Sequence, residues 1–201
     1  MREDIRQNRI NLKHMFDAVE ATNHAQKVLI SDEALENAIH LILEQASNGG
    51  KLIFIGNGGS AAIASHMATD FWKNAGIKAM AFNDSSLITC VSNDHGYEYV
   101  FEKSIEMFGE PGDVLMAISS SGKSENILRG VNAAQKKGLR ILTFSGFKSD
   151  NPLRREGDVN FYVPAEHYGY VEVIHHALCH CLIDVIMKNK SKKAERAISH
   201  E

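Results

Sequence analysis

The sequence predicts an α/β fold in which a parallel sheet of five strands lies between two layers of helices, with two further helices at the N-terminus. Short apolar runs alternate with segments whose apolar residues recur at helical spacing, and each connection is long enough for a crossover between parallel strands. The 201 residues are enough for one such unit, and no linker or repeat divides them. We expect a single domain, 1–201, made of helices over 1–48, a core over 51–190 and a polar tail over 191–201.

The two N-terminal helices are predicted from apolar spacing and end signals. Apolar residues from Ile5 to Val19 predict a long amphipathic helix over 3–28. A second helix is expected to begin at Ser31 and to end at Asn48-Gly49-Gly50. Because a small sheet does not need both helices for cover, contacts between subunits are one role for them.

Five apolar runs predict the strands of the sheet, and the segments between them predict its helices. The strands are expected at 51–56, 78–82, 114–118, 140–144 and 159–163. Helices are expected over 61–73, through 85–89, and over 99–107, 125–136 and 170–189, with turn-like residues at 93–96.

Composition excludes several classes of function. The net charge of −3 leaves no electrostatic footprint for nucleic acid. No apolar run approaches the roughly 20 residues of a membrane span, and the charged N-terminus lacks the apolar region of a secretory signal. The three cysteines (Cys90, Cys179 and Cys181) lie in apolar contexts and favour a reduced protein. We therefore expect a cytoplasmic protein without a nucleic-acid or membrane partner.

The stretch 114–128 carries the main functional signal. A buried strand runs into Ser119, Ser120 and Ser121, and Ser124 stands where the next helix begins. Unpaired backbone N–H groups, the positive end of the helix dipole and serine hydroxyls all favour an anion at this point. The pattern predicts a phosphate site, and the alternative is that one serine merely caps the helix.

A glycine-rich turn, 56–60, follows the first strand. Its glycines permit a tight turn and the close approach of a ligand to Gly58 and its neighbours. The spacing is not the dinucleotide pattern, so no nucleotide cofactor is expected.

Acids and histidines recur on two predicted helices. His66 and Asp70 share one helix face, and Glu172, His176 and His180 recur every four residues on the last helix, with His175 off that stripe. These two helix faces have three possible roles: a solvated surface, a contact between subunits, or a functional site built from His66, Asp70, Glu172 and His180. Such a set suits a divalent metal, most simply Zn²⁺, or the transfer of protons, and the residue types alone leave both open.

The chain resembles the SIS (sugar isomerase) domain family and, within it, the phosphoheptose isomerase group. The resemblance covers nearly the whole chain and is carried by GNGGSAA at 56–62, SNDHGYEYVF at 92–101, GDVLMAISSSGKSENI at 112–127 and the histidines of the closing helix. It implies a flavodoxin-like three-layer fold, a homotetramer with active sites between subunits, and the interconversion of sedoheptulose 7-phosphate and D-glycero-D-manno-heptose 7-phosphate by proton transfer through an enediolate.

The resemblance also implies roles for individual residues. The phosphate would lie on Ser119, Ser120, Ser121 and Ser124, and the sugar pocket would be lined by Asn57, Gly58, Ser60 and Asp94. The catalytic pair would be Asp70 and His180, with Glu172 as a third catalytic residue, and a zinc ion would be held by His66, Asp70, Glu172 and His180.

Three positions depart from the pattern of that group. Asp70 replaces a glutamate, Glu172 replaces a glutamine, and Tyr170 replaces an arginine. The first two departures compensate each other if Glu172 serves as the base or strengthens a metal site, while Asp70 becomes mainly a ligand or an orienting residue. They also leave two alternatives open, namely a relative that acts on another sugar phosphate, and a non-catalytic protein that binds phosphosugars for regulation.

Overall fold

The computed structural model describes the backbone of residues 1–198 and the side chains of residues 1–192. Its helices are α1 (Arg2–Asp17), α2 (Ser31–Ser47), α3 (Gly59–Lys73), α4 (Ser85–His95), α5 (Val100–Phe108), α6 (Glu125–Lys136) and α7 (Tyr168–Ile198), with two short 3-10 turns, η1 (Tyr97–Tyr99) and η2 (Pro152–Arg155). The strands are β1 (Glu20–Asn23), β2 (Val28–Leu29), β3 (Leu52–Gly56), β4 (Ala79–Ala81), β5 (Val114–Ser119), β6 (Arg140–Gly146) and β7 (Val159–Val163).

The sheet has seven strands in the order β2-β1-β7-β6-β5-β3-β4. The five strands from β3 to β7 pair in parallel, and β1 and β2 add an antiparallel pair at the edge beside β7. The prediction of a purely parallel, five-stranded sheet is therefore wrong in strand number and in the direction of the edge strands. Strand β3 pairs with β4 on one side and with β5 on the other, so the strand order reverses at β3, as in doubly wound folds.

The edge pair also corrects the first predicted helix. Helix α1 ends at Asp17, and residues expected in its last turns form β1 and β2. The chain reverses between them where Gln26 takes a positive φ of 59° and Asn23 Oδ1 accepts a hydrogen bond from Lys27 N. Pairing of all four residues of β1 with β7 outweighs the helical spacing of the local sequence.

The remaining elements lie close to their predicted places, with two extensions. Helix α4 continues through 93–95, which the sequence suggested as a turn, and ends at Gly96 with a positive φ of 106°. Helix α7 continues through the first residues of the predicted polar tail to Ile198, and the rest of that tail, 199–201, lies outside the described residues.

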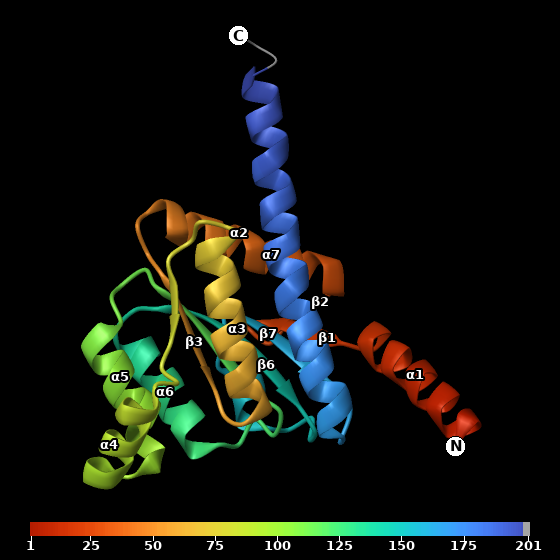
Figure 1. Ribbon diagram of the computed structural model, residues 1–201, viewed down its shortest axis with the longest axis horizontal. Coiled ribbons are helices and arrows are strands. Elements are labelled where there is room, and N and C mark those ends of the chain that lie inside the picture. Colours follow the sequence, from red (N-terminus) through yellow and green to blue (C-terminus); the bar gives the residue numbers. More distant parts are fainter. Residues whose placement is uncertain (199–201) are drawn as a thin grey trace.

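Helices cover both faces of the sheet (Figure 1), as expected. One apolar core joins α2, α3 and α7 to one face, and a second joins α5 and α6 to the other. Alternate residues of each strand serve the two cores, so Phe54 and Met116 belong to the first, and Ile53 and Leu115 to the second. Helices α3 and α7 thus lie side by side on one face, with β3 and β5 beneath α3 and with β6 and β7 beneath α7.

Helix α7 is the only helix in the described residues that is long and apolar enough to cross a membrane, with a mean hydropathy of 1.4 over an 18-residue window within Tyr168–Lys192. Its apolar residues, including Val171, Ile174, Leu178 and Leu182, are buried in the core beside the sheet. Burial of this kind is typical of a core helix in a globular protein.

Candidate functional site

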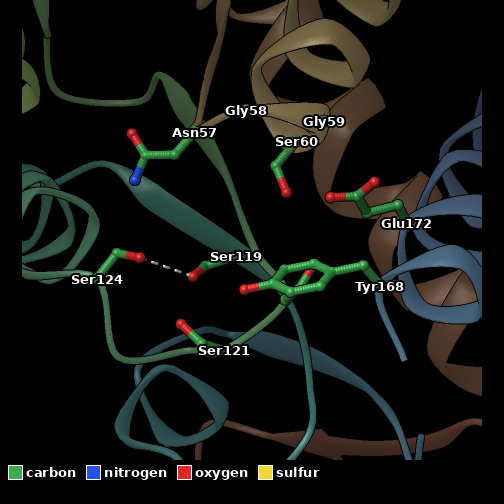
Figure 2. A pocket seen from close by; sticks show the side chains of 10 residues that line it. Asn57, Gly58, Gly59, Ser60, Ser119, Ser121, Ser124, Tyr168 and Glu172 are labelled. Carbon is green, nitrogen blue, oxygen red and sulfur yellow. Dashed lines mark hydrogen bonds between the residues drawn. The ribbon is translucent and has the colours of Figure 1, made fainter. Parts of the chain in front are cut away.

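A pocket of about 230 Å³ opens where β3 and β5 end. Figure 2 shows its lining, which consists of Asn57, Gly58, Gly59, Ser60, Ser119, Ser120, Ser121, Ser124, Tyr168 and Glu172. The chain leaves β3 toward β4 on one side, and β5 lies on its other side. The pocket therefore occupies the point where strand order reverses, which is the usual ligand site of open α/β sheets.

The turn after β3 forms one wall of the pocket. Gly56 is required there, because a Cβ would lie 2.5 Å from Ser60 O, and Gly58 has a positive φ of 54°. The Asn57 amide exchanges two hydrogen bonds of 2.9 Å with the amide of Asn126, in the first turn of α6. Asn57 thereby ties this turn to the helix that follows the serine loop.

The serine loop after β5 forms the opposite wall. Gly122 takes a positive φ of 61° and donates its N–H to Ser119 O over 3.0 Å. A Cβ at Gly122 would lie 2.0 Å from Oδ1 of the buried Asn151. Asn151 itself donates to Gly146 O and Lys148 O, so the segment after β6 supports the loop from behind.

Two serines in this loop keep hydroxyls available for a ligand. Ser120 is 5% exposed, and its Oγ is buried without a hydrogen-bond partner in the described structure. Ser124 occupies the N-cap of α6, but its side chain makes no capping hydrogen bond and lies 3.5 Å from Ser119 Oγ. The capping alternative is therefore not what the structure shows, and the N-terminus of α6 faces the pocket with unpaired donors.

Glu172 carries the only carboxylate among the lining residues. It projects from α7 toward the start of α3 (Figure 2), where a Cβ on Gly59 would lie 2.4 Å from its Oε2. The positive end of the α3 dipole favours a carboxylate at that position. The pocket thus has a neutral, donor-rich end at the serines and an acidic end at Glu172.

Tyr168, in the first turn of α7, lies between these two ends. Its ring packs edge-on against Phe147 at 4.9 Å, and its hydroxyl points toward the serines (Figure 2). Phe147 takes a positive φ of 57°, a conformation that is rare for a bulky residue and is found mainly at functional sites. No sequence pattern marks Tyr168 as a site residue, because its position depends on how α7 approaches β6.

A cluster of histidines lies beside the pocket, between α3 and α7. Each of His66, His176 and His180 offers a ring nitrogen within 4.8 Å of the others. Asp70 Oδ2 lies 3.3 Å from His66 Nε2. Burial lowers the pKa of His176, and so do the neighbouring rings of His180 and His66, so its imidazole is neutral at neutral pH.

His175, which the sequence placed off this stripe, has a different environment. It is fully buried, its Nε2 lies 3.0 Å from Ser145 O, and burial lowers its pKa to about 4. A neutral His175 therefore joins α7 to β6 beneath the pocket.

The structure gathers most of the predicted site residues but not all of them. Asn57, Gly58, Ser60, the four serines of the loop and Glu172 line the pocket together. His66, Asp70 and His180 lie outside its lining, with the histidine cluster. Asp94 lies on α4, where it contacts Asn93 and Cys90 and does not line the pocket. Gly59, Tyr168 and His176 were not predicted as site residues.

Comparisons with known proteins show the family of the chain. The sequence profile of the SIS domain matches residues 16–146. The chain is 37% identical over 187 residues to a phosphoheptose isomerase of Proteus mirabilis, covering 88% of this chain and 96% of that protein. It is 39% identical over 184 residues to one of Photorhabdus laumondii, covering 86% and 94%. The structure of phosphoheptose isomerase GmhA from Neisseria gonorrhoeae superposes with a TM-score of 0.79 at 30% identity, covering 92% of this chain and 98% of that one.

Proposed function

Since this chain belongs to the SIS domain family, we propose that it is an aldose–ketose isomerase of phosphosugars, with sedoheptulose 7-phosphate as its substrate. One observation carries the proposal beyond the likeness to phosphoheptose isomerases. A single pocket holds a serine-rich anion cradle at one end and a carboxylate at the other. This arrangement suits a substrate that is anionic at one end and loses a carbon-bound proton at the other.

In the proposed complex, the phosphate group lies on Ser119, Ser120, Ser121 and Ser124, at the N-terminus of α6. The free hydroxyl of Ser120 and the unpaired N–H groups of the helix donate hydrogen bonds to it. The carboxylate of Glu172 repels the phosphate from the other end of the pocket, so the charges alone select one direction of binding.

Glu172 is the proposed base. Its carboxylate removes the proton from the carbon beside the carbonyl, and the electron pair of that C–H bond forms the C=C bond of an enediolate. The former carbonyl oxygen takes up the negative charge and then a proton. The hydroxyl on the carbon that was deprotonated then loses its proton and becomes the new carbonyl, and the proton held by Glu172 is delivered to the former carbonyl carbon, which completes the interconversion of ketose and aldose. Asp70 and His180 remain in the proposed catalytic set. Without a bound metal they exchange protons with the two oxygens, and with a metal bound its Lewis acidity would replace that exchange.

A divalent metal, most simply Zn²⁺, is a further part of the proposal. The side chains fit such an ion, because imidazole and carboxylate are its usual ligands and the buried Nε2 of His176 has no partner in the described structure. When bound, the metal would act as a Lewis acid toward the developing enediolate oxygen. His66 and His180 of the predicted set lie together and Asp70 adjoins His66, whereas the carboxylate of Glu172 lies at Gly59.

Assembly into a cytoplasmic homotetramer, with active sites between subunits, is also proposed. Helix α1 supports it, since it buries none of its residues within the chain and projects from the body (Figure 1). Its apolar residues Ile5, Ile10 and Phe16 are between 41% and 57% exposed. Light scattering coupled to gel filtration tests this: we expect a tetramer for the wild type and smaller species for Ile5→Glu.

The function is tested by turnover of sedoheptulose 7-phosphate with the wild type, Glu172→Gln and Asp70→Asn. Loss of a general base costs about 10²–10⁴-fold in rate, so we expect a fall of this size in kcat for Glu172→Gln. We expect sugar phosphate to bind Glu172→Gln at least as tightly as the wild type, because the change removes a like charge from the pocket. Full activity of Glu172→Gln would contradict the assignment of the base.

A further inference from the structure

We propose that His176 completes a three-imidazole site for a divalent cation with His66 and His180, that Asp70 orients His66, and that Glu172 takes no part in this site. This inference rests on the part of the proposed function that includes a divalent metal, and it changes which residues bind that metal. It adds a histidine that the sequence analysis left unassigned and removes the glutamate.

The three imidazoles come from two adjacent helices. His66 lies on α3, while His176 and His180 lie one turn apart on α7. Their ring centroids are 5.0 Å (His66–His176), 5.3 Å (His66–His180) and 4.7 Å (His176–His180) apart. Each ring offers a nitrogen within 4.8 Å of the other two, which is the convergence that a shared cation requires.

His176 has a buried ring nitrogen, Nε2, that lacks a hydrogen-bond partner in the described part of the chain. A buried polar atom without a partner costs about 1–3 kcal/mol and is rare in folded proteins. His175, the adjacent residue on the same helix, also has a buried ring nitrogen, Nδ1, without a partner in the described residues, although its Nε2 lies 3.0 Å from Ser145 O. His176 differs in that two further imidazoles, His66 on α3 and His180 on α7, lie against its ring.

Asp70 has the position of an outer carboxylate. Its Oδ2 lies 3.3 Å from His66 Nε2, and its Oδ1 accepts a hydrogen bond of 3.2 Å from Asn74 Nδ2. A histidine that binds a metal through one ring nitrogen usually donates the other N–H to a carboxylate, which fixes the ring and strengthens the ligand. Asp70 would hold His66 in this way and leave the other ring nitrogen of His66 for the cation.

Glu172 is directed away from the cluster. Although it lies one turn before His176 on α7, its carboxylate packs at Gly59, seven residues before His66 on α3. Seven residues of helix span about 10 Å. Among the described residues, no carboxylate meets the mutual spacing of the three ring nitrogens. The pocket and the cation site are thus adjacent, and Glu172 is free to act on the substrate.

Three imidazole ligands would leave one position of a tetrahedral Zn²⁺ ion open for water or a substrate oxygen. We therefore expect one Zn²⁺ per chain, bound in competition with a coloured chelator, and expect Co²⁺ at the same site to give the visible absorption bands of a tetrahedral complex. The affinity should fall on the order of 100-fold or more in His176→Ala, since removing even an outer partner of a ligand costs 10–100-fold.

Four further variants make the test specific. His176→Gln repeats the ligand loss with a polar side chain, in case alanine disturbs folding. Asp70→Asn should weaken Zn²⁺ binding about 10–100-fold. Glu172→Gln should leave the affinity within about threefold of the wild type, and so should His40→Ala, which removes an exposed imidazole on α2.

The proposal is overturned if the wild type binds no Zn²⁺ more tightly than a surface histidine would, or if both His176 variants bind it as the wild type does. It is also overturned if Glu172→Gln loses as much affinity as His176→Ala, because Glu172 would then be a ligand. Since metal binding is measured without substrate, these outcomes are separate from any failure of the isomerase assignment, which turnover of sedoheptulose 7-phosphate reports.

Discussion

Replacement of Gly59 by alanine, at the acidic end of the pocket, should lower kcat without lowering the stability of the fold. Gly59 is the first residue of α3, and an added Cβ would lie 2.4 Å, 2.5 Å and 2.6 Å from Oε2, Cδ and Oε1 of Glu172. Ordinary contacts begin at 3.4 Å, so the carboxylate must retreat by about 1 Å. A misplacement of that size costs on the order of 10²-fold in rate.

The fold should tolerate the same change. The group displaced is the end of a flexible side chain, and alanine is favoured over glycine in helices by up to about 1 kcal/mol. We therefore expect Gly59→Ala to unfold at the same temperature as the wild type or above it, and to bind inorganic phosphate at the serines normally. Its kcat for sedoheptulose 7-phosphate should fall about 100-fold.

The matched control is Gly169→Ala, in the first turn of α7, where no atom lies within 4 Å of an added Cβ. This variant should keep the activity of the wild type. If Gly59→Ala also keeps it, the position of the Glu172 carboxylate does not matter to the reaction, and the assignment of Glu172 as base is wrong.

Three further predictions concern the cradle, the core and the sheet. Ser120→Ala should raise the Kd for inorganic phosphate, measured by calorimetry, about tenfold. It should not lower stability, because the Ser120 hydroxyl has no partner in the described structure. An unchanged Kd would show that Ser120 does not bind the phosphate. His175 has a folded pKa of about 4, below the unfolded value of 6.5, so the unfolded chain binds the proton first and the free energy of unfolding should fall by about 3 kcal/mol between pH 6.5 and pH 4. Urea titrations across that range should show this slope, and His175→Gln should lack it. Asp113 is 1% exposed, and its Oδ2 lies 2.7 Å from Lys51 Nζ, so Asp113→Ala should lower the free energy of unfolding in urea by about 3 kcal/mol. Glu110→Ala, which removes the exposed partner of Lys51, should lower it by less than about 1 kcal/mol. Equal losses in the two variants would refute this difference.

The parallel part of the fold could be predicted because its information is local. Fully buried strands such as Val114–Ser119 are continuous apolar runs, and glycines and serines mark the turns that follow them. The serines that line the pocket could be grouped from the sequence for the same reason, since Ser119 to Ser124 are close in the chain and their geometry follows from one strand, one turn and one helix.

The antiparallel edge could not be predicted in this way. Val19 continues the helical spacing of α1, and the four-residue strand that follows it gains its stability from pairing with β7, about 140 residues later in the chain. The same limit applied to the site. His176 was visible on the stripe of α7, but its approach to His66 depends on how α3 and α7 pack, which the spacing within either helix does not determine. Asp94 was assigned to the pocket by resemblance, and it lies on α4 outside the lining.

The central claim is tested most directly by following the reaction from both directions. Purified protein is incubated with sedoheptulose 7-phosphate alone, and separately with D-glycero-D-manno-heptose 7-phosphate alone, and both sugars are quantified over time. The proposed isomerase should bring the two reactions to the same mixture, and Glu172→Gln should approach it 10²–10⁴-fold more slowly. Binding of either sugar phosphate without any interconversion would contradict the claim and would indicate a protein that binds phosphosugars without transforming them.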